Sequence, residues 1–568
     1  MLFDKIKKAI RSGGSEEGGL EFRVKDGLAY VSSYKGNEST VSIPDMIDTN
    51  PVARIDDGAF SGASSLTSIV LPESIITIGK GAFKGCKNLQ SIEIPDTVGI
   101  IEKGAFKGCR SLKSIRLPSP LKSVEPETFS GCDSLKTIDF HTALTEIGKN
   151  AFEGCKSLES VVIPESVTTI GAGAFSDCVT LKSVSLPDTV TTIGKEAFKG
   201  CEGLPSIEIP DTVTTIEDGA FSGCKSLASI EIPESVTNVG AKAFFACKNL
   251  KTAKIPASVT YLGNGAFDWC ASLASVEAPG SAQVLKELSG CKALKSVSIV
   301  ESVESIEDNA FKGYSVLSSV SIPASVKTIG KEAFAGCAAL ESITVKEDNP
   351  EYSSENGVLF DKSKTKLIRF PESKSSDPIN PYKMPASVTT IGANAFDGCT
   401  SLSAIEIPDT ITSIGEKAFN KCSALISIAM PDSVNYIGKG AFADCRSLSS
   451  AIIPSKTTTI REGTFEACTS LIAVKITDSV TSIEYKAFSG CGALKSLELS
   501  NSVQSIGSYA FGDCKTLASV VIPESVRSVD DKAFAGCSSL KTATVHRSTD
   551  INPGAFPSGC EIVYAEKE

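Results

Sequence analysis

The residues best suited to chemistry in this sequence are its 19 cysteines, because a thiolate can act as a nucleophile, a metal ligand or half of a disulfide. Most of them recur every 23 residues, as Cys86, Cys109, Cys132 and Cys155 do. A structural metal centre needs several ligands close together, and no CxxC pair occurs. One thiol per repeat instead predicts a column of buried, free cysteines that pack as small apolar groups.

Other catalytic groups are sparse. The two histidines, His141 and His546, take the place that proline has in most repeats and lie many repeats apart, which argues against a histidine triad or metal site. The sequence has no phosphate-binding G-x4-G-K-[ST] loop and no G-x-S-x-G elbow. Carboxylate pairs such as Asp530-Asp531 are typical of solvated turns. We therefore expect no catalytic residue, no metal, no cofactor and no enzymatic activity.

A phenylalanine three residues before most of the cysteines defines the elements that position them. Twenty of the 26 phenylalanines fall in this slot, from Phe60 to Phe556. A fixed period of this length predicts a solenoid, in which each coil contacts mainly its neighbours. If Leu288 is counted as the anchor of a coil without phenylalanine, the chain has about 21 coils of 23 residues.

A typical coil is LKSVSLPDTVTTIGKEAFKGC, residues 181–201. Alternation of apolar and polar residues up to Pro187 predicts a short parallel strand, which ends there because proline cannot donate to a ladder. Val190 and Ile193 predict a second extended segment, and residues 196–198 predict a short helical or 3₁₀ corner. One coil buries too little apolar surface to offset its ordering entropy, so the coils must stack.

Breaks in the pattern divide the chain into parts. A basic amphipathic leader and a flexible linker come first, and a single solenoid with two caps and two interruptions follows. The parts are residues 1–19 (leader and linker), 20–568 (solenoid), 20–43 (N-terminal cap hairpin about Lys25-Asp26-Gly27), 277–291 (irregular coil), 345–385 (island insert) and 552–568 (C-terminal cap). The insert predicts a hairpin or two aberrant coils, and residues 282–288 have a helical pattern.

The repeat LxxIxIPdsVtxIGxxAFxgCxs, seen in residues 227–249, resembles the BspA-type leucine-rich repeat. The resemblance extends over nearly the whole chain after residue 20 and includes the insert NPEYSSENGVLFDKSKTKLIRFP. It implies a leucine-rich-repeat solenoid that binds proteins in an adhesin-like role, with host matrix or cell-surface proteins as partners. The alternatives are an intracellular interaction scaffold of the same fold and, more distantly, an enzyme.

Charge and hydropathy restrict the partners further. The net charge of -11 is not gathered into blocks, so we expect no nucleic-acid partner. No apolar run reaches the length of a membrane span, and the N-terminus lacks the apolar core of a secretory signal. The family implies the cell surface, whereas the missing signal leaves the cytoplasm open. Residues 2–11 predict at most a weak peripheral contact with a membrane.

One candidate binding surface follows the predicted strands. A row of small serine hydroxyls lies beside a slot whose side chain varies from coil to coil, and together they could dock an extended partner. The candidates in the variable slot are Glu208, Glu231, Lys254 and Glu277. The alternative interpretation is that serine simply tolerates the close stacking of strands.

A second candidate surface lies near residues 277–291. Phe245, Tyr261 and Trp269, the only tryptophan, occupy slots that are small or polar in most coils. Aromatic residues outside the core pattern are typical of an interaction hot spot. The alternative interpretation is that they fill space left by the shortened coil.

Overall fold

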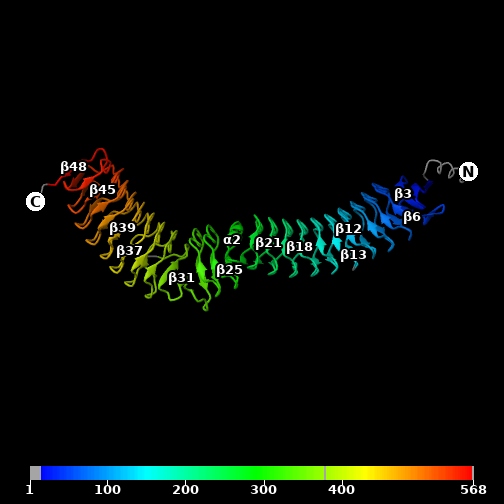
Figure 1. Cartoon of the computed structure of the whole chain (residues 1–568), viewed down its shortest axis with the longest axis horizontal. Helices are drawn as coiled ribbons and strands as arrows, with labels where there is room; N and C mark the ends of the chain where they lie inside the picture. The colour runs from blue at the N-terminus through cyan, green and yellow to red at the C-terminus, as the bar shows by residue number, and fades with distance from the viewer. Residues whose placement is uncertain (1–14, 142, 377–378, 566–568) are drawn as a thin grey trace. The chain divides into compact units, whose positions relative to one another are not determined.

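The structure of the protein is a computed structural model that describes residues 15–141, 143–376 and 379–565. These residues form short, mostly parallel strands and one helix, α2 (Ala282–Leu288). The chain divides after Leu294 into two compact units, and in each unit the coils stack side by side (Figure 1). The predicted solenoid of leucine-rich coils is confirmed in both units. Residues 1–14 of the predicted leader lie outside the described residues.

Each regular coil of the first unit contributes one strand to each of two parallel ladders. The first ladder contains β4 (Thr40–Ser42), β7 (Ser68–Val70), β9 (Ser91–Ile92), β11 (Ser114–Arg116), β13 (Thr137–Asp139), β15 (Ser160–Val162), β17 (Ser183–Ser185), β20 (Ser229–Glu231), β22 (Thr252–Lys254) and β24 (Ser275–Ala278). The second ladder contains β6 (Asn50–Ile55), β8 (Thr77–Ile78), β10 (Ile100–Ile101), β12 (Ser123–Val124), β14 (Glu146–Ile147), β16 (Thr169–Ile170), β18 (Thr192–Ile193), β19 (Thr215–Ile216), β21 (Asn238–Val239) and β23 (Tyr261–Leu262).

The second unit repeats this arrangement. Its first ladder contains β25 (Ser296–Ile299), β27 (Ser319–Ile322), β29 (Ser342–Val345), β33 (Tyr382–Lys383), β35 (Ile405–Glu406), β38 (Ser450–Ile452), β40 (Ala473–Lys475), β42 (Ser496–Glu498), β44 (Ser519–Val521), β46 (Thr542–Val545) and β48 (Glu561–Tyr564). Its second ladder contains β26 (Ser305–Ile306), β28 (Thr328–Ile329), β34 (Thr390–Ile391), β36 (Ser413–Ile414), β37 (Tyr436–Ile437), β39 (Thr459–Ile460), β41 (Ser482–Ile483), β43 (Ser505–Ile506), β45 (Ser528–Val529) and β47 (Asp550–Ile551).

Paired strands keep the register of the sequence repeat. Ser160 lies opposite Ser183, and Ile147 lies opposite Ile170, each pair 23 residues apart. Identical slots therefore form continuous rows along each ladder. The coil after β17 has no strand in the first ladder, and Pro205 explains this gap because it has no N–H group to donate to the preceding coil.

The corner of each coil is a series of hydrogen-bonded turns rather than a continuous helix. In one coil the Ala197 N–H donates to Gly194 O (3.1 Å), three residues back, whereas the Phe198 N–H donates to Ala220 O of the next coil (2.8 Å). Residues with positive φ, here Glu196 (55°) and Gly200 (70°), separate the turns. Alternate N–H groups thus point along the stack, and the corner becomes a third ladder.

Stacked phenylalanine rings fill the interior next to the corner. The Phe198 and Phe221 ring centroids lie 5.6 Å apart with the planes 5° from parallel, and this geometry recurs along both units. Every described cysteine except Cys560 is buried, which confirms the predicted thiol column. Because each coil stacks on its neighbours through these two columns, burial is shared along the unit.

The N-terminal cap is a hairpin of β2 (Leu20–Lys25) and β3 (Leu28–Tyr34), with β1 (Ser15–Glu17) on one side. The hairpin predicted about Lys25-Asp26-Gly27 is formed, and Asp26 and Gly27 have the positive φ values (53° and 76°) of its tight turn. The strand β5 (Met46–Ile47) pairs with β6 nearby. The cap covers the first edge of the second ladder, because β3 pairs in parallel with β6.

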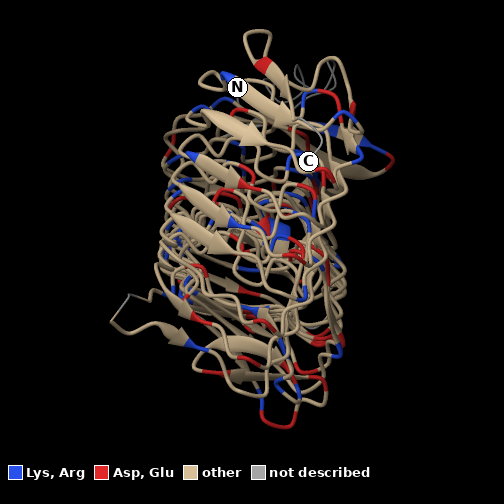
Figure 2. Cartoon of the chain, turned by 90° about the vertical axis from the view of Figure 1, so that its left-hand side faces the viewer, with Lys and Arg blue, Asp and Glu red and all other residues tan. Residues whose placement is uncertain are grey.

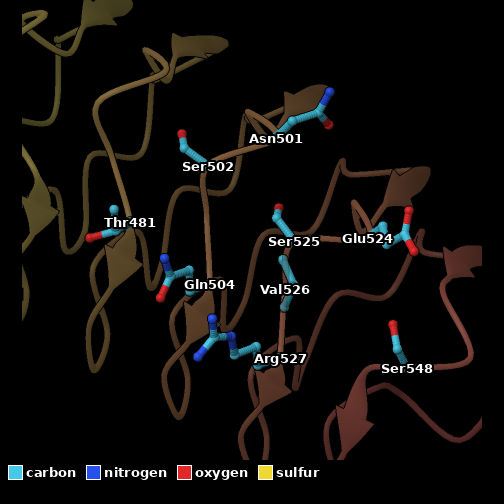
Figure 3. Close-up of a pocket in the computed structure, with 9 residues that line it drawn as sticks. All are labelled: Thr481, Asn501, Ser502, Gln504, Glu524, Ser525, Val526, Arg527 and Ser548. Atoms are coloured by element: carbon cyan, nitrogen blue, oxygen red, sulfur yellow. The ribbon is translucent and has the colours of Figure 1, made fainter.

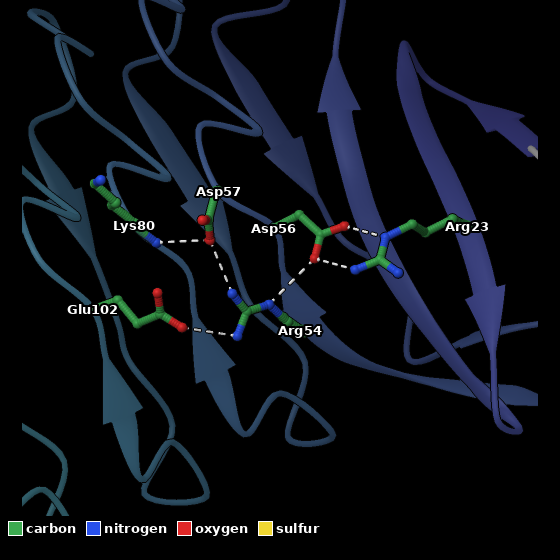
Figure 4. A network of polar contacts seen from close by, with 6 residues as sticks. All are labelled: Arg23, Arg54, Asp56, Asp57, Lys80 and Glu102. Atoms are coloured by element: carbon green, nitrogen blue, oxygen red, sulfur yellow. Dashed lines mark hydrogen bonds and ion pairs between the residues drawn. The ribbon is translucent and has the colours of Figure 1, made fainter.

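A network of charged side chains fixes this cap to the first coils (Figure 4). Arg54 on β6 donates to Asp56 (3.2 Å), to Asp57 (2.9 Å) and to Glu102 two coils further on (3.0 Å). Arg23 on β2 donates to both oxygens of Asp56. The Asp57 carboxylate also accepts the Lys80 N–H (3.1 Å). The Arg54 bonds and the Asp57–Lys80 bond together join three successive coils of the stack.

Candidate binding surfaces

The variable slot of the first ladder forms the row that was predicted from the repeat. Glu231 lies opposite Lys254, and Lys254 lies opposite Glu277, on β20, β22 and β24. The Lys254 ammonium donates to Glu231 at 2.6 Å, and this hydrogen bond raises the pKa of Lys254. Glu208 is exposed in the preceding coil, which has no first-ladder strand, so no strand pairing places it opposite Glu231.

This charge pairing changes how the row could recognise a partner. Lys254 neutralises Glu231, so the row is not a simple acidic strip for a basic segment. Acidic and basic residues are also interspersed along the coils more widely (Figure 2). An exposed ion pair of this kind contributes little to stability, about 0–1 kcal/mol. The pair is therefore available to exchange its partner for a charged group of another protein.

The three aromatic candidates occupy two different parts of their coils. Tyr261 begins β23 on the second ladder and is 50% exposed. Phe245 and Trp269 lie in corners, and Phe245 is half-buried with the Lys242 ammonium 5.7 Å from its ring centroid. No ring contact joins the three residues in the part of the chain that the structure describes. They are neighbours along the stack but do not form one aromatic cluster.

Trp269 differs from the other two because its side chain is 74% exposed. Its φ of 62° lies in the left-handed region, where the equivalent residue of other coils is commonly glycine, as at Gly200 (70°) and Gly223 (75°). A bulky residue in this region costs about 1–2 kcal/mol. Other coils also hold non-glycine residues at positive φ in this slot, as at Asp177 (58°) and Ala246 (56°), so the feature that sets Trp269 apart is its exposed apolar ring.

A hollow of about 420 Å³ lies beside Trp269 and is lined also by Asp268, Gly290 and Lys292. It opens where the irregular coil replaces a normal corner by α2. Ser281 caps this helix by accepting the Val284 N–H (3.2 Å), and Leu288 is buried as the coil anchor. The helix predicted for residues 282–288 is confirmed.

Side chains of α2 replace hydrogen bonds that the second-ladder strand and the corner of a regular coil would supply. The Gln283 amide accepts the Leu262 N–H (3.1 Å) and donates to the Leu262 carbonyl (2.7 Å), so one amide completes both sides of the ladder. Glu287 accepts the Gly265 N–H at 3.4 Å. These bonds close the ladder and leave the surface next to Trp269 uncovered.

The island insert builds a three-stranded antiparallel sheet from β30 (Tyr352–Glu355), β31 (Val358–Asp361) and β32 (Lys366–Arg369). The predicted hairpin is therefore formed, with one further strand than was expected. Strand β32 then pairs in parallel with β34, which returns the chain to the second ladder. Phe370 stacks on Phe396 (4.9 Å) and so restarts the ring column.

The insert also holds a buried ion pair that the sequence analysis missed. Arg369 and Glu372 are 5% and 6% exposed, and the Arg369 guanidinium donates to the Glu372 carboxylate. Burial raises the pKa of Glu372, and Arg369 opposes that rise. The signal was available in LIRF, because alternation places Arg369 on the same inward face as Leu367.

Another hollow, of about 510 Å³, lies on the second unit and is lined mainly by polar residues (Figure 3). In regular coils a serine or threonine before the second ladder donates to the preceding coil, as Ser235 does to Val213 O (2.7 Å). At this hollow the pattern changes: Ser502 bonds Ser500 (2.5 Å), and the buried Ser525 hydroxyl has no partner. The hollow marks the place where this row of hydroxyl bonds ends.

The buried thiols form weak hydrogen bonds to the backbone instead of a reactive site. The Cys201 thiol donates to Phe175 O of the preceding coil at 3.2 Å, and equivalent bonds recur along both units. Burial raises the pKa of most of these thiols, to about 12 for Cys86. Within the described residues no group of three or more His, Cys, Asp or Glu side chains could hold a metal ion. No described helix is long and apolar enough to cross a bilayer.

Several solved structures are similar to this chain. A leucine-rich repeat protein from Bacteroides ovatus is 29% identical, over 78% of this chain and 95% of that one, with a TM-score of 0.45. A leucine-rich repeat protein of T. pallidum is 27% identical, over 46% of this chain and 90% of that one, with a TM-score of 0.26. A leucine-rich cell surface protein from Faecalibacterium prausnitzii is 23% identical, over 98% and 95%, with a TM-score of 0.25.

A family model accounts for the repeat itself. No curated protein matches the chain. The model described as BspA type leucine rich repeat region (6 copies) matches residues 53–182, 168–289, 286–380, 373–492 and 458–565. These matches extend over nearly all of the coils described above, including both interruptions. The chain therefore belongs to the BspA-type leucine-rich repeat family.

Proposed function

We propose that this chain is a non-enzymatic protein-binding solenoid with an adhesin-like role, whose partners are matrix or cell-surface proteins. The family is a protein-interaction fold, which supports the general class. The observation that carries the proposal furthest is Trp269, 74% exposed on a strained backbone beside a hollow of about 420 Å³. Tryptophan is enriched among the few residues that dominate binding energy at interfaces.

The neighbouring residues suit the edge of such an interface. Tyr261 offers a second exposed ring, and the Glu231–Lys254 pair with Glu277 offers charges that a partner can engage. Phe245 is only half-buried and extends the apolar surface along the corner. An apolar centre with a charged rim is the common anatomy of a protein interface.

The test uses the full chain, because Trp269 is its only tryptophan and reports on its own surroundings. A protein captured by affinity selection on the intact chain is purified and titrated against it while the tryptophan emission is recorded. We expect a blue shift on binding, and we expect Trp269→Gly to weaken binding at least tenfold, since hot-spot residues contribute about 2 kcal/mol or more.

The control is Tyr436→Ala, which removes an exposed ring on the second unit that occupies the same slot as Tyr261. It should leave the affinity unchanged. Trp269→Gly restores the residue common at this slot and should not lower the melting temperature. Unchanged affinity of Trp269→Gly for the captured protein would contradict the proposed role of this surface.

An intracellular scaffold of the same fold is the second candidate. Free thiols would favour a reducing compartment, but all described cysteines except Cys560 are buried, and burial raises the pKa of thiols such as Cys201, which protects them from oxidation in either compartment. The thiols therefore do not separate the two candidates. Cell fractionation separates them: a pool accessible to protease on intact cells supports adhesion, and an exclusively cytoplasmic pool supports the scaffold.

A further inference from the structure

The corner ladder of the second unit is interrupted at the coil that precedes the island insert. One coil earlier, three N–H groups donate along the stack: Asn309 to Lys331 O (3.0 Å), Phe311 to Ala333 O (2.8 Å) and Gly313 to Ala335 O (2.9 Å). The equivalent groups of the next coil are those of Glu332, Phe334 and Gly336. Among the described residues only the Gly336 N–H has a partner, and that partner is a carboxylate oxygen of Glu372 (2.7 Å).

Arg369 lies across this interruption. Its guanidinium donates to Phe334 O on one side (3.2 Å) and to Asn394 O on the other (2.6 Å). The side chain is 6% exposed, and its Nε–H is buried without a hydrogen-bond partner. A buried charged donor without an acceptor costs about 1–3 kcal/mol or more. The structure therefore holds three donors at this place, the Arg369 Nε–H and the Glu332 and Phe334 N–H groups, that lack an acceptor.

A hollow of about 490 Å³ lies beside these donors, and Glu332, Phe334 and Arg369 are among the residues that line it. Its rim carries Lys331, Lys366 and Lys417. Of the carboxylates on the same lining, Glu332 is paired with Lys312 outside the hollow (2.7 Å) and Glu416 is exposed. The rim therefore has an excess of positive charge, and the interior has an excess of hydrogen-bond donors.

We propose that this hollow is a binding site for a carboxylate group. A carboxylate is an acceptor-only group with two oxygens, so it can satisfy several donors at once while the three lysines offset its charge. Glu372 already shows this chemistry, since its oxygen accepts the third N–H of the same row. The site lies in the second unit and does not depend on Trp269 or on the proposed adhesive role.

The carboxylate can come from a small acid or from an acidic peptide, and two probes distinguish these sources. Succinate and tetraglutamate are titrated into the full chain by calorimetry at low ionic strength, with the neutral isostere succinamide as the control ligand. Hydrogen–deuterium exchange follows the Glu332 and Phe334 amides, with Phe311 as the internal reference because its N–H is paired.

The site predicts binding of at least one acid, with slower exchange at Glu332 and Phe334 and no change at Phe311. Removing the rim charges in Lys366→Gln/Lys417→Gln should weaken binding roughly three- to tenfold, the effect of two exposed charge interactions. The matched control Lys439→Gln, whose lysine pairs with Glu462 elsewhere on the same unit, should bind as the wild type does. Binding of tetraglutamate alone assigns the site to a peptide, and binding of succinate assigns it to a small acid. Absence of binding by both acids, or equal protection by succinamide, would overturn the proposal.

Discussion

The irregular coil in the first unit and the island insert in the second both interrupt the second ladder and the corner ladder, but their side chains close the break in different ways. At the irregular coil, the neutral amide of Gln283 bonds both backbone groups of Leu262. At the insert, the charged Arg369 joins Phe334 O to Asn394 O and is itself paired with Glu372. In both places side chains take the place of backbone groups that a regular neighbouring coil would supply.

The surfaces next to the two interruptions differ in the same way as the side chains that close them. Where the neutral Gln283 amide closes the break, an exposed tryptophan lies beside a hollow of about 420 Å³. Where the charged Arg369 closes it, unpaired donors lie beside a hollow of about 490 Å³ with a lysine rim. In a regular coil the corner N–H groups of Glu196, Phe198 and Gly200 all donate to the next coil. The comparison indicates that an interruption of the repeat can create a surface that a regular corner lacks.

The largest expected effect tests whether the insert restores the core. Phe198→Ala in a regular coil should cost about 3–5 kcal/mol, because it leaves a cavity in the ring column. Phe370→Ala should cost a similar amount, since Phe370 is fully buried and stacks on Phe396 at 4.9 Å. Urea denaturation monitored by circular dichroism measures both. A cost below about 1 kcal/mol for Phe370→Ala is typical of surface positions and would contradict the conclusion that the insert restores the core.

Removing one partner of the buried Arg369–Glu372 ion pair should lower the free energy of unfolding almost as much, whereas removing both partners should not. Arg369→Met leaves the Glu372 carboxylate buried without its partner and should cost about 3 kcal/mol or more. The double variant Arg369→Met/Glu372→Leu removes both charges and should recover most of that loss. The same denaturation experiment gives the coupling between the two residues. If the double variant is as unstable as the single one, the interruption is not held by this pair.

A smaller loss of stability is expected when the Gln283 amide is replaced. Gln283→Leu keeps the size of the side chain and removes the two hydrogen bonds to Leu262, so it should cost about 1–3 kcal/mol. A second variant, Gln283→Glu, keeps an acceptor for the Leu262 N–H and loses the donor, so its loss of stability should be intermediate. Thermal unfolding of the three proteins gives the ranking. Equal melting temperatures would show that α2 does not close the ladder.

The smallest effect on stability is expected at Trp269. Its ring is 74% exposed, so Trp269→Ala should change the free energy of unfolding by less than about 0.5 kcal/mol. Trp269→Gly should be slightly more stable than Trp269→Ala, because glycine adopts the φ of 62° without strain. A large loss of stability in both variants would instead support the interpretation that the ring fills space at the shortened coil.

Much of the fold could be predicted because the same pattern of apolar, phenylalanine and cysteine positions recurs in nearly every coil. The phenylalanine slot located the ring column, and the pattern of residues 282–288 located α2. Phe370 was missed because it lies outside the 23-residue spacing and enters the column only after the insert has formed. The corner turns were also beyond the sequence pattern, because residues such as Glu196 adopt positive φ only when the stack supplies their hydrogen bonds.

The candidate surfaces were less predictable than the fold. The departure of Trp269 from its slot was visible in the sequence, but its exposure depends on how α2 closes the next coil. The row of Glu231, Lys254 and Glu277 followed from the spacing, whereas its internal ion pair depends on side-chain conformation. Arg369 could have been found from its inward position in β32, but the three coil segments that it joins are distant in sequence.

The most direct test of this account is residue-resolved amide exchange on the unliganded full chain. The Phe198 and Phe311 N–H groups donate to the next coil at 2.8 Å, whereas those of Phe267 and Phe334, at the two interruptions, have no acceptor among the described residues. The account predicts exchange at Phe267 and Phe334 that is at least about tenfold faster than at Phe198 and Phe311. Uniformly slow exchange at all four amides would contradict it.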